Sequence, residues 1–306
     1  MPLDPQAQMI LEQLATMNFS LTRDMTPTQA REFSKALAIP VEPEPVESVK
    51  DQTFPGPDGE IPVRIYTPQG DGPFPMLVFF HGGGWVIGDI ESHDPVCRRL
   101  TNLAGCVVIS VDYRLAPEHP FPAAPEDCYA ALQWVATHAN KLHGDSTKIA
   151  VGGDSAGGTL SAVVAHMARD RGGPPLAFQL LIYPATDMRM NTPSIEENAT
   201  GYLLTKEDMI WFSNHYLPNP EDKLHPLASP YLASNLSGLP PALIITAEYD
   251  PLRDEGENYG TRLKEAGVPV TVSRYNGAIH GFISLLELGN QALAEAAAAL
   301  KAAFAQ

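Results

Sequence analysis

One serine of this 306-residue chain lies where an exposed nucleophile is expected. Gly153-Asp154-Ser155-Ala156-Gly157 follows the apolar run 149–151 and precedes the helix-like stretch 159–167. In a G-x-S-x-G turn the serine adopts a strained backbone, and the flanking glycines let a strand and a helix cross closely. The motif alone is modest evidence, since chance yields roughly 0.1 such patterns in a chain of this length. The alternative interpretation is a glycine-rich turn without a catalytic role.

A serine needs a base, and the histidine best placed to act as one is His280. A histidine removes the proton of the serine, and a carboxylate holds that histidine in the right tautomer. His280 follows the predicted strand 270–275 and a short turn at 276–279. It is therefore predicted to lie on a loop beyond the carboxyl end of a strand.

Asp250 is the acid best placed to orient this histidine, since it comes just after an apolar predicted strand. Glu248 and Asp254 are neighbouring acids that could be confused with it. The order Ser155, Asp250, His280, with each residue after a different strand, is one of the orders known for such triads. We predict these three as the catalytic residues.

A glycine-rich segment supplies candidate donors for the oxyanion of an acyl-transfer reaction. His81-Gly82-Gly83-Gly84-Trp85 directly follows the predicted buried strand 76–80, and no side chain blocks the approach to the backbone amides of its glycines. Its glycines, with Gly88 and then Asp112, loosely resemble a dinucleotide-binding turn. That alternative requires G-x-G-x-x-G at the start of a helix and an acid about twenty residues on. The spacing here does not match.

The elements that must position these residues alternate between strands and helices. Such alternation predicts an α/β fold with a mainly parallel sheet covered by helices on both faces. Several predicted strands are apolar throughout, as buried parallel strands are. A turn at 57–60 predicts an antiparallel hairpin between 49–54 and 61–66. The predicted strands are 63–66, 76–80, 107–111, 149–151, 178–182, 243–246 and 270–275.

Two stretches interrupt this alternation and are predicted to form a helical cap. The stretch 1–45 has an amphipathic start and then an N-cap, a proline at the first helical position and a capping-box glutamine in Thr26-Pro27-Thr28-Gln29. The stretch 186–226 holds the helix candidate 205–216 and is long for a simple crossover. The catalytic core is then 46–185 and 227–306. The alternative for the insertion is an extra packed helix.

Five motifs occur in an order and spacing that is far more specific than any one of them: His81-Gly82-Gly83-Gly84-Trp85, Tyr113-Arg114-Leu115-Ala116-Pro117-Glu118, Gly153-Asp154-Ser155-Ala156-Gly157-Gly158, Asp250-Pro251-Leu252-Arg253-Asp254 and His280-Gly281-Phe282. Together they resemble the bacterial hormone-sensitive-lipase family of carboxylesterases, the GDSAG-type family IV esterases of the α/β-hydrolase superfamily. The resemblance spans nearly the whole chain.

This resemblance implies an α/β-hydrolase fold and the role of each site residue. Ser155 is expected as nucleophile, His280 as general acid and base, and Asp250 as the residue that orients it. The resemblance also assigns the oxyanion-hole amides, which are those of Gly83, Gly84 and Ala156. The bonds Ala116-Pro117 and Phe121-Pro122 are expected as cis peptides in a tight loop under the site.

The expected activity is hydrolysis of short- to medium-chain carboxylic esters through an acyl-enzyme, without metal or organic cofactor. Large apolar residues of the insertion predict a closed apolar pocket, which disfavours long lipid tails. The residues predicted to contact substrate are Trp85, Leu204, Met209 and Phe212.

Two alternative functions share this scaffold. A non-catalytic receptor, as in plant gibberellin receptors, replaces the catalytic histidine, whereas His280 is intact here. An amidase or peptidase has the same triad and differs in how it handles the leaving group. The sequence leaves the amidase alternative open.

The net charge, the apolar runs and the cysteines of the sequence indicate which binding partners and which cellular location to expect. A net charge of −16 opposes binding to nucleic acid and to anionic membranes. The sequence has no apolar run of about 18 residues and no signal peptide at its start, which predicts a cytoplasmic enzyme without a membrane span. Three cysteines without C-x-x-C spacing indicate buried thiols and no zinc site. A homodimer through the C-terminal helix and strand 270–275 is an option that the sequence leaves open.

Overall fold

An eight-stranded sheet forms the centre of this computed structural model, which describes residues 1–16, 25–36 and 42–306. The strand order is β1-β2-β4-β3-β5-β6-β7-β8. The strands are β1 (Ser48–Gly56), β2 (Gly59–Thr67), β3 (Phe74–Phe80), β4 (Val107–Val111), β5 (Gly144–Asp154), β6 (Phe178–Ile182), β7 (Ala242–Tyr249) and β8 (Val270–Ile279).

The sheet is antiparallel at one edge and parallel from β4 onward. β1 and β2 form the predicted hairpin, with Gly56 paired to Gly59, and β2 pairs antiparallel with β4. The remaining neighbours pair in parallel, so the carboxyl ends of β3 to β8 lie along one edge of the sheet. Ligand sites of α/β sheets lie at this edge. The predicted mostly parallel sheet is confirmed.

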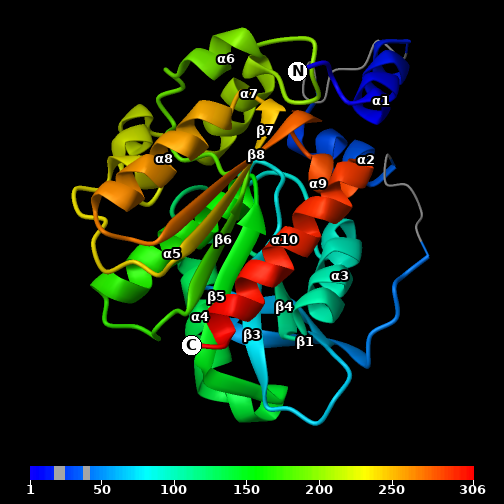
Figure 1. Cartoon of the computed structure of the whole chain (residues 1–306). Helices are drawn as coiled ribbons and strands as arrows, with labels where there is room; N and C mark the ends of the chain where they lie inside the picture. The colour runs from blue at the N-terminus through cyan, green and yellow to red at the C-terminus, as the bar shows by residue number, and fades with distance from the viewer. Residues whose placement is uncertain (17–24, 37–41) are drawn as a thin grey trace.

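Helices cover both faces of the sheet (Figure 1). On one face, α3 and α10 pack against each other and against strand residues such as Leu77 and Val108. On the other face, α4 and α5 pack together, and α8 lies against β7 and β8. The bounds are α3 (Asp94–Ala104), α4 (Ala123–His138), α5 (Ala156–Asp170), α8 (Arg253–Glu265), α9 (Phe282–Leu285) and α10 (Glu287–Phe304).

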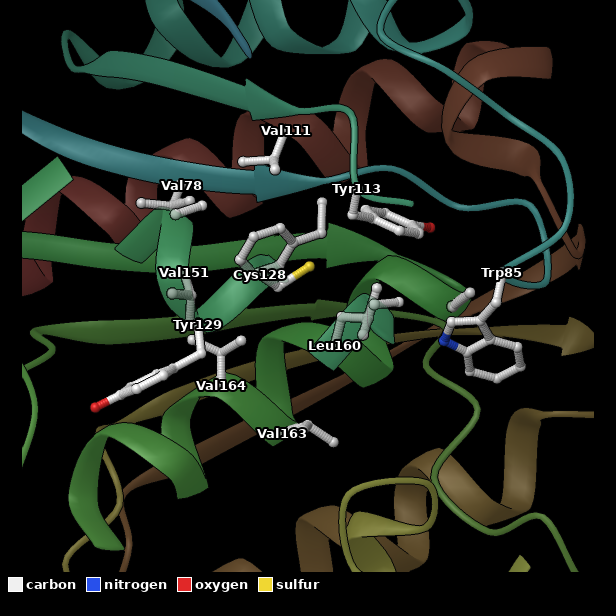
Figure 2. Close-up of a cluster of buried hydrophobic side chains, with 14 of the residues drawn as sticks. Val78, Trp85, Val111, Tyr113, Cys128, Tyr129, Val151, Leu160, Val163 and Val164 are labelled. Carbon is white, nitrogen blue, oxygen red and sulfur yellow. The ribbon is translucent and has the colours of Figure 1, made fainter. Parts of the chain in front are cut away.

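On the side of α4 and α5, the hydrophobic core extends from the sheet to Trp85 in the loop after β3. Figure 2 shows side chains from the strands, among them Val78 and Val151, beside Cys128 of α4 and Leu160 of α5. Trp85 lies at the end of this cluster and is only 4% exposed. The loop after β3 is therefore fixed in the core by its tryptophan.

Four α-helices lie in the described residues of the two stretches predicted as the cap: α1 (Pro5–Thr16), α2 (Pro27–Ala36), α6 (Pro193–Glu197) and α7 (Lys206–Tyr216). Figure 1 shows α1, α6 and α7 at the end of the molecule toward which β7 and β8 point. Thr26 and Gln29 exchange the predicted capping-box hydrogen bonds at the start of α2. Residues 17–24 and 37–41 lie outside the described residues, and the division into core and cap stays a prediction.

The structure corrects one strand boundary. The predicted turn at 276–279 belongs to β8, which continues to Ile279 and pairs there with Tyr249 of β7. Asp4 N–H donates to Gly277 O, and Gly277 N–H donates to Glu248, so the backbone of this glycine is held on both sides. The Ala116-Pro117 and Phe121-Pro122 bonds are cis as predicted, and the three cysteines are free and buried.

Candidate active site

Ser155 occupies the sharp turn between β5 and α5. Its φ of 53° and ψ of −121° are strained for a residue with a side chain. A Cβ atom on Gly153 would lie 2.3 Å from Phe80 O, and one on Gly157 would lie 1.9 Å from the same oxygen. The close approach of β3 to the turn therefore requires glycine at both positions. Close crossing at this turn is the reason for the glycines that the G-x-S-x-G motif predicted.

Hydrogen bonds join Ser155 to His280 and Asp250. The Ser155 hydroxyl lies 3.0 Å from His280 Nε2, and His280 Nδ1 lies 2.7 Å from Asp250 Oδ2. These distances suit a serine that donates to an imidazole whose other nitrogen donates to a carboxylate. The three residues follow β5, β7 and β8, so the parallel sheet brings them to one edge.

The neighbouring acids have other partners. The N–H of Leu252 donates to Asp250 Oδ1, which fixes the second oxygen of that carboxylate. Glu248 lies 2.6 Å from the amino group of Met1. Asp254 accepts the N–H of Ser194 at 2.8 Å. Of the three acids that the sequence offered, the structure brings Asp250 to His280.

The loop after β3 brings backbone amides to the serine. Gly83, Gly84 and Ala156 line the same cavity as Ser155. Gly83 has a φ of +119°, and a Cβ there would lie 2.2 Å from Ile87 O. A Cβ on Gly84 would lie 2.4 Å from the ring of Phe212. Only glycine fits this tight path, which leaves the amides accessible.

Asp154 and His93 connect this loop to the nucleophile turn, and sequence reasoning missed both. Asp154 Oδ1 accepts the N–H of Gly82 at 3.0 Å and lies 2.9 Å from His93 Nε2. Burial alone would raise the pKa of Asp154, but the charge of His93 and its hydrogen bond lower that pKa below 3.8. Burial would lower the pKa of His93, and Asp154 raises it above 6.5. A buried ion pair results.

Two further residues contact parts of the site, and sequence reasoning did not identify them. The ring of Tyr183 lies 4.6 Å from the ring of His280, centroid to centroid, and follows β6 directly. Its position after a strand is a signal that the sequence did contain. Arg31 of α2 donates from Nε to Val86 O at 2.7 Å. This hydrogen bond connects α2 to the loop after β3 that holds Gly82 to Gly84, called the glycine loop below. No motif marks this arginine.

An apolar cavity of about 220 Å³ opens above Ser155. All four residues predicted to contact substrate line it, and they come from the glycine loop and the insertion: Trp85, Leu204, Met209 and Phe212. Met188, Met190 and Leu252, which the prediction omitted, line it as well. Trp85 stacks on Tyr216 of α7 with centroids 4.4 Å apart, so its ring also joins the loop to the insertion.

The described ranges contain no group of three or more histidine, cysteine, aspartate or glutamate side chains arranged to hold a metal ion. Within the same ranges, no helix is both long enough and apolar enough to cross a membrane.

Comparisons with known proteins agree with this geometry. A family model described as alpha/beta hydrolase fold matches residues 77–284. The carboxylic ester hydrolase LipN of Mycobacterium tuberculosis is 46% identical over 297 residues, which cover 94% of this chain and 78% of LipN. An arylesterase of Saccharolobus solfataricus is 38% identical over 99% of this chain and 100% of its own.

Among solved structures, a hyperthermophilic esterase from the archaeon Pyrobaculum calidifontis is similar with a TM-score of 0.92 and 50% identity, over 99% of both chains. The chain belongs to the α/β-hydrolase family. Its predicted fold and its predicted resemblance to esterases of the hormone-sensitive-lipase type are confirmed.

Proposed function

We propose that this chain, a carboxylic ester hydrolase by its family and relatives, cleaves short- to medium-chain esters through an acyl-enzyme formed on Ser155. The observation that carries the proposal is the hydrogen-bonded series from Ser155 Oγ through His280 to Asp250. It lies beside glycine amides in an apolar cavity of about 220 Å³.

The proposed reaction has two steps. Ser155 Oγ attacks the ester carbonyl carbon while His280 Nε2 takes the hydroxyl proton, and the protonated histidine then gives that proton to the departing alcohol. A water molecule next attacks the acyl-enzyme while His280 Nε2 takes its proton. The histidine then gives this proton to Ser155 Oγ as the acyl–oxygen bond breaks and the carboxylic acid leaves. Asp250 keeps the tautomer in which Nε2 is free to accept a proton.

In both steps, the carbonyl oxygen gains negative charge. We assign its stabilisation to the backbone N–H groups of Gly83, Gly84 and Ala156. The amide of Ala156 is also the first N–H of α5, where the helix dipole favours an anion. Removal of a single donor of this kind typically costs about 10²–10³ in kcat.

The walls of the cavity support the proposed substrate range. Apart from the catalytic groups, side chains such as Leu204, Met209 and Phe212 surround the serine. An apolar acyl or alkoxy group gains roughly 0.8 kcal/mol for each buried CH₂ until the cavity is full. A volume of about 220 Å³ favours short and medium chains over lipid tails.

A panel of p-nitrophenyl esters with acyl chains of about two to sixteen carbons tests this proposal, with Ser155→Ala as control. We expect kcat/KM to peak at short or medium length and to fall by about 10⁴ or more in Ser155→Ala. A peak at the long end would overturn the substrate range. Parallel p-nitroanilide assays separate esterase from amidase action, and we expect the esters to be far better substrates.

We further propose that the protein acts in the cytoplasm on small-molecule esters, which its charge of −16 supports. A homodimer is proposed through β8, because this strand ends the sheet order and pairs only with β7 among the strands that the structure describes. Light scattering after size exclusion tests the dimer: twice the mass of the 33.1 kDa chain is expected, and the mass of one chain would exclude it.

A further inference from the structure

A second, more polar cavity adjoins the active-site cavity. Its volume is about 770 Å³, against about 220 Å³ above the serine. The two cavities share Ser34, Gly88 and Ser92 in their walls. Gly88 therefore lies between the apolar cavity at Ser155 and a space lined by α2 and by the segment that follows β4.

The cations of this second cavity already have carboxylate partners. Arg31 binds Glu118 at 2.6 Å, and its hydrogen bonds lower the pKa of Glu118 to about 2. Lys35 lies 3.1 Å from Asp89.

Arg114 completes the pattern, since it binds Asp127 at 2.7 Å and Asp58 at 2.8 Å. Arg31, Lys35 and Arg114 are therefore each engaged, so an anionic ligand would find none of these three described cations unpaired.

Asp112 differs from these groups. It follows β4 at the carboxyl edge of the sheet, lines the second cavity and is partly buried. Its carboxylate makes no hydrogen bond or ion pair with any residue that the structure describes. Burial and the nearby charges of Asp89 and Glu91 raise its pKa to about 6, although Lys35 acts in the opposite direction.

A partly buried carboxylate that lies close to other acids and has no partner among the described residues is stabilised by a ligand of opposite charge. An ammonium group would supply a charge of the opposite sign, whereas a neutral group would leave the anion unpaired. Lys35 is 71% exposed at its side chain and binds Asp89, so it offers little compensation at Asp112.

We infer that the second cavity is a subsite for the ammonium-bearing end of an ester substrate, which Asp112 recognises while the ester group lies at Ser155. This inference rests on the proposed function and narrows its substrate class to esters that combine an apolar chain with a terminal cation. The apolar chain fills the cavity above the serine, and the cation lies beyond Gly88.

Matched p-nitrophenyl esters test the inference. One series carries a terminal trimethylammonium group on chains of about three to ten methylenes, and the other carries the isosteric tert-butyl group. We expect one range of chain lengths at which kcat/KM of the cationic ester exceeds that of its neutral isostere by about tenfold. Added salt should reduce this preference, because screening weakens charge pairing.

Two variants test whether Asp112 causes the preference for the cationic ester. Asp112→Asn should bring the ratio of cationic to neutral kcat/KM to about one while the neutral ester keeps its rate within about twofold. Asp145→Asn, which removes a charge at the start of β5 away from both cavities, should leave the ratio unchanged.

Preference for the neutral ester at every length would overturn the inference, as would a preference that survives Asp112→Asn or disappears equally in Asp145→Asn. If Asp112→Asn does not fold, the salt dependence of the ratio of cationic to neutral kcat/KM in the unaltered chain tests the inference. A ratio that does not change with salt would contradict recognition by charge. Absence of p-nitrophenyl butanoate hydrolysis would instead overturn the proposed function itself.

Discussion

The carboxylate of Asp154 lies 2.9 Å from His93 Nε2, directly between the nucleophile turn and the glycine loop. The same oxygen accepts the N–H of Gly82, and a Cβ on Gly82 would lie 2.4 Å from the other carboxylate oxygen. The ion pair therefore helps to fix the distance between Ser155 and the amides of Gly83 and Gly84.

Removal of this connection should lower turnover more than binding. In Asp154→Ala the loop loses its hydrogen-bond acceptor, so we expect kcat to fall about 10- to 100-fold, less than the full cost of a lost oxyanion donor. KM should change by less than about threefold. Asp154→Asn keeps an acceptor oxygen and should recover part of kcat. A rise in KM with kcat unchanged would show that Asp154 acts on binding alone.

The ion pair also predicts a pH dependence of stability. The raised pKa of His93 stabilises the fold fully below pH 6.5, and this contribution is lost as pH rises through that raised value. The lowered pKa of Asp154 stabilises the fold above pH 3.8, and this contribution is lost as pH falls through the lowered value. The pair therefore contributes most between about pH 4 and 6.5.

Urea unfolding of the unaltered chain and His93→Gln at two pH values measures this contribution. At pH 5.5 the variant should be less stable by about 3 kcal/mol, a typical cost of breaking a buried pair. At high pH the difference should narrow. An equal difference at both pH values would mean that His93 stabilises the fold by packing rather than by charge.

The turn glycines should be intolerant of even one methyl group. Gly157→Ala places Cβ 1.9 Å from Phe80 O, and the forced shift should cost about 1–3 kcal/mol and reduce kcat. Gly256→Ala is the matched control, because it lies inside α8 with its nearest neighbour atom 3.4 Å away. It should stabilise the fold by about 0.5–1 kcal/mol. Similar melting temperatures for both variants would contradict the steric account.

Phe212 should limit acyl length. Its ring lies against Gly84, lines the cavity and is 6% exposed. Phe212→Ala should enlarge the cavity and move the kcat/KM optimum toward longer acyl chains. Ile210→Ala, which changes a residue of α7 that is 44% exposed and outside the cavity wall, should leave the optimum in place. An unchanged optimum in Phe212→Ala would place the limit elsewhere.

Sequence patterns predicted the parts of the site that follow strands. Ser155, Asp250 and His280 each follow a different predicted strand, so a parallel sheet gathers them at one edge. The pairing of Asp154 with His93 was not predictable in this way, because His93 lies in a short 3-10 helix, Glu91–His93, after the glycine loop. Arg31 reaches Val86 across 55 residues, and no local pattern records such a contact.

The boundary of β8 shows a different limit. Asn276 and Gly277 are typical of turns, and Gly277 has a φ of +79°. Pairing of Ile279 with Tyr249 nevertheless extends the strand to the residue before His280. Tertiary hydrogen bonds to Gly277 outweigh the local preference for a turn, which is why the sequence alone predicted a loop there.

Covalent labelling tests the central claim most directly. A fluorophosphonate probe should react once with the unaltered chain, and mass spectrometry of the digest should place the label on Ser155. Ser155→Ala should remain unlabelled under the same conditions. A label on another residue, or a folded and unaltered chain that does not react, would contradict an acyl-enzyme mechanism at this serine.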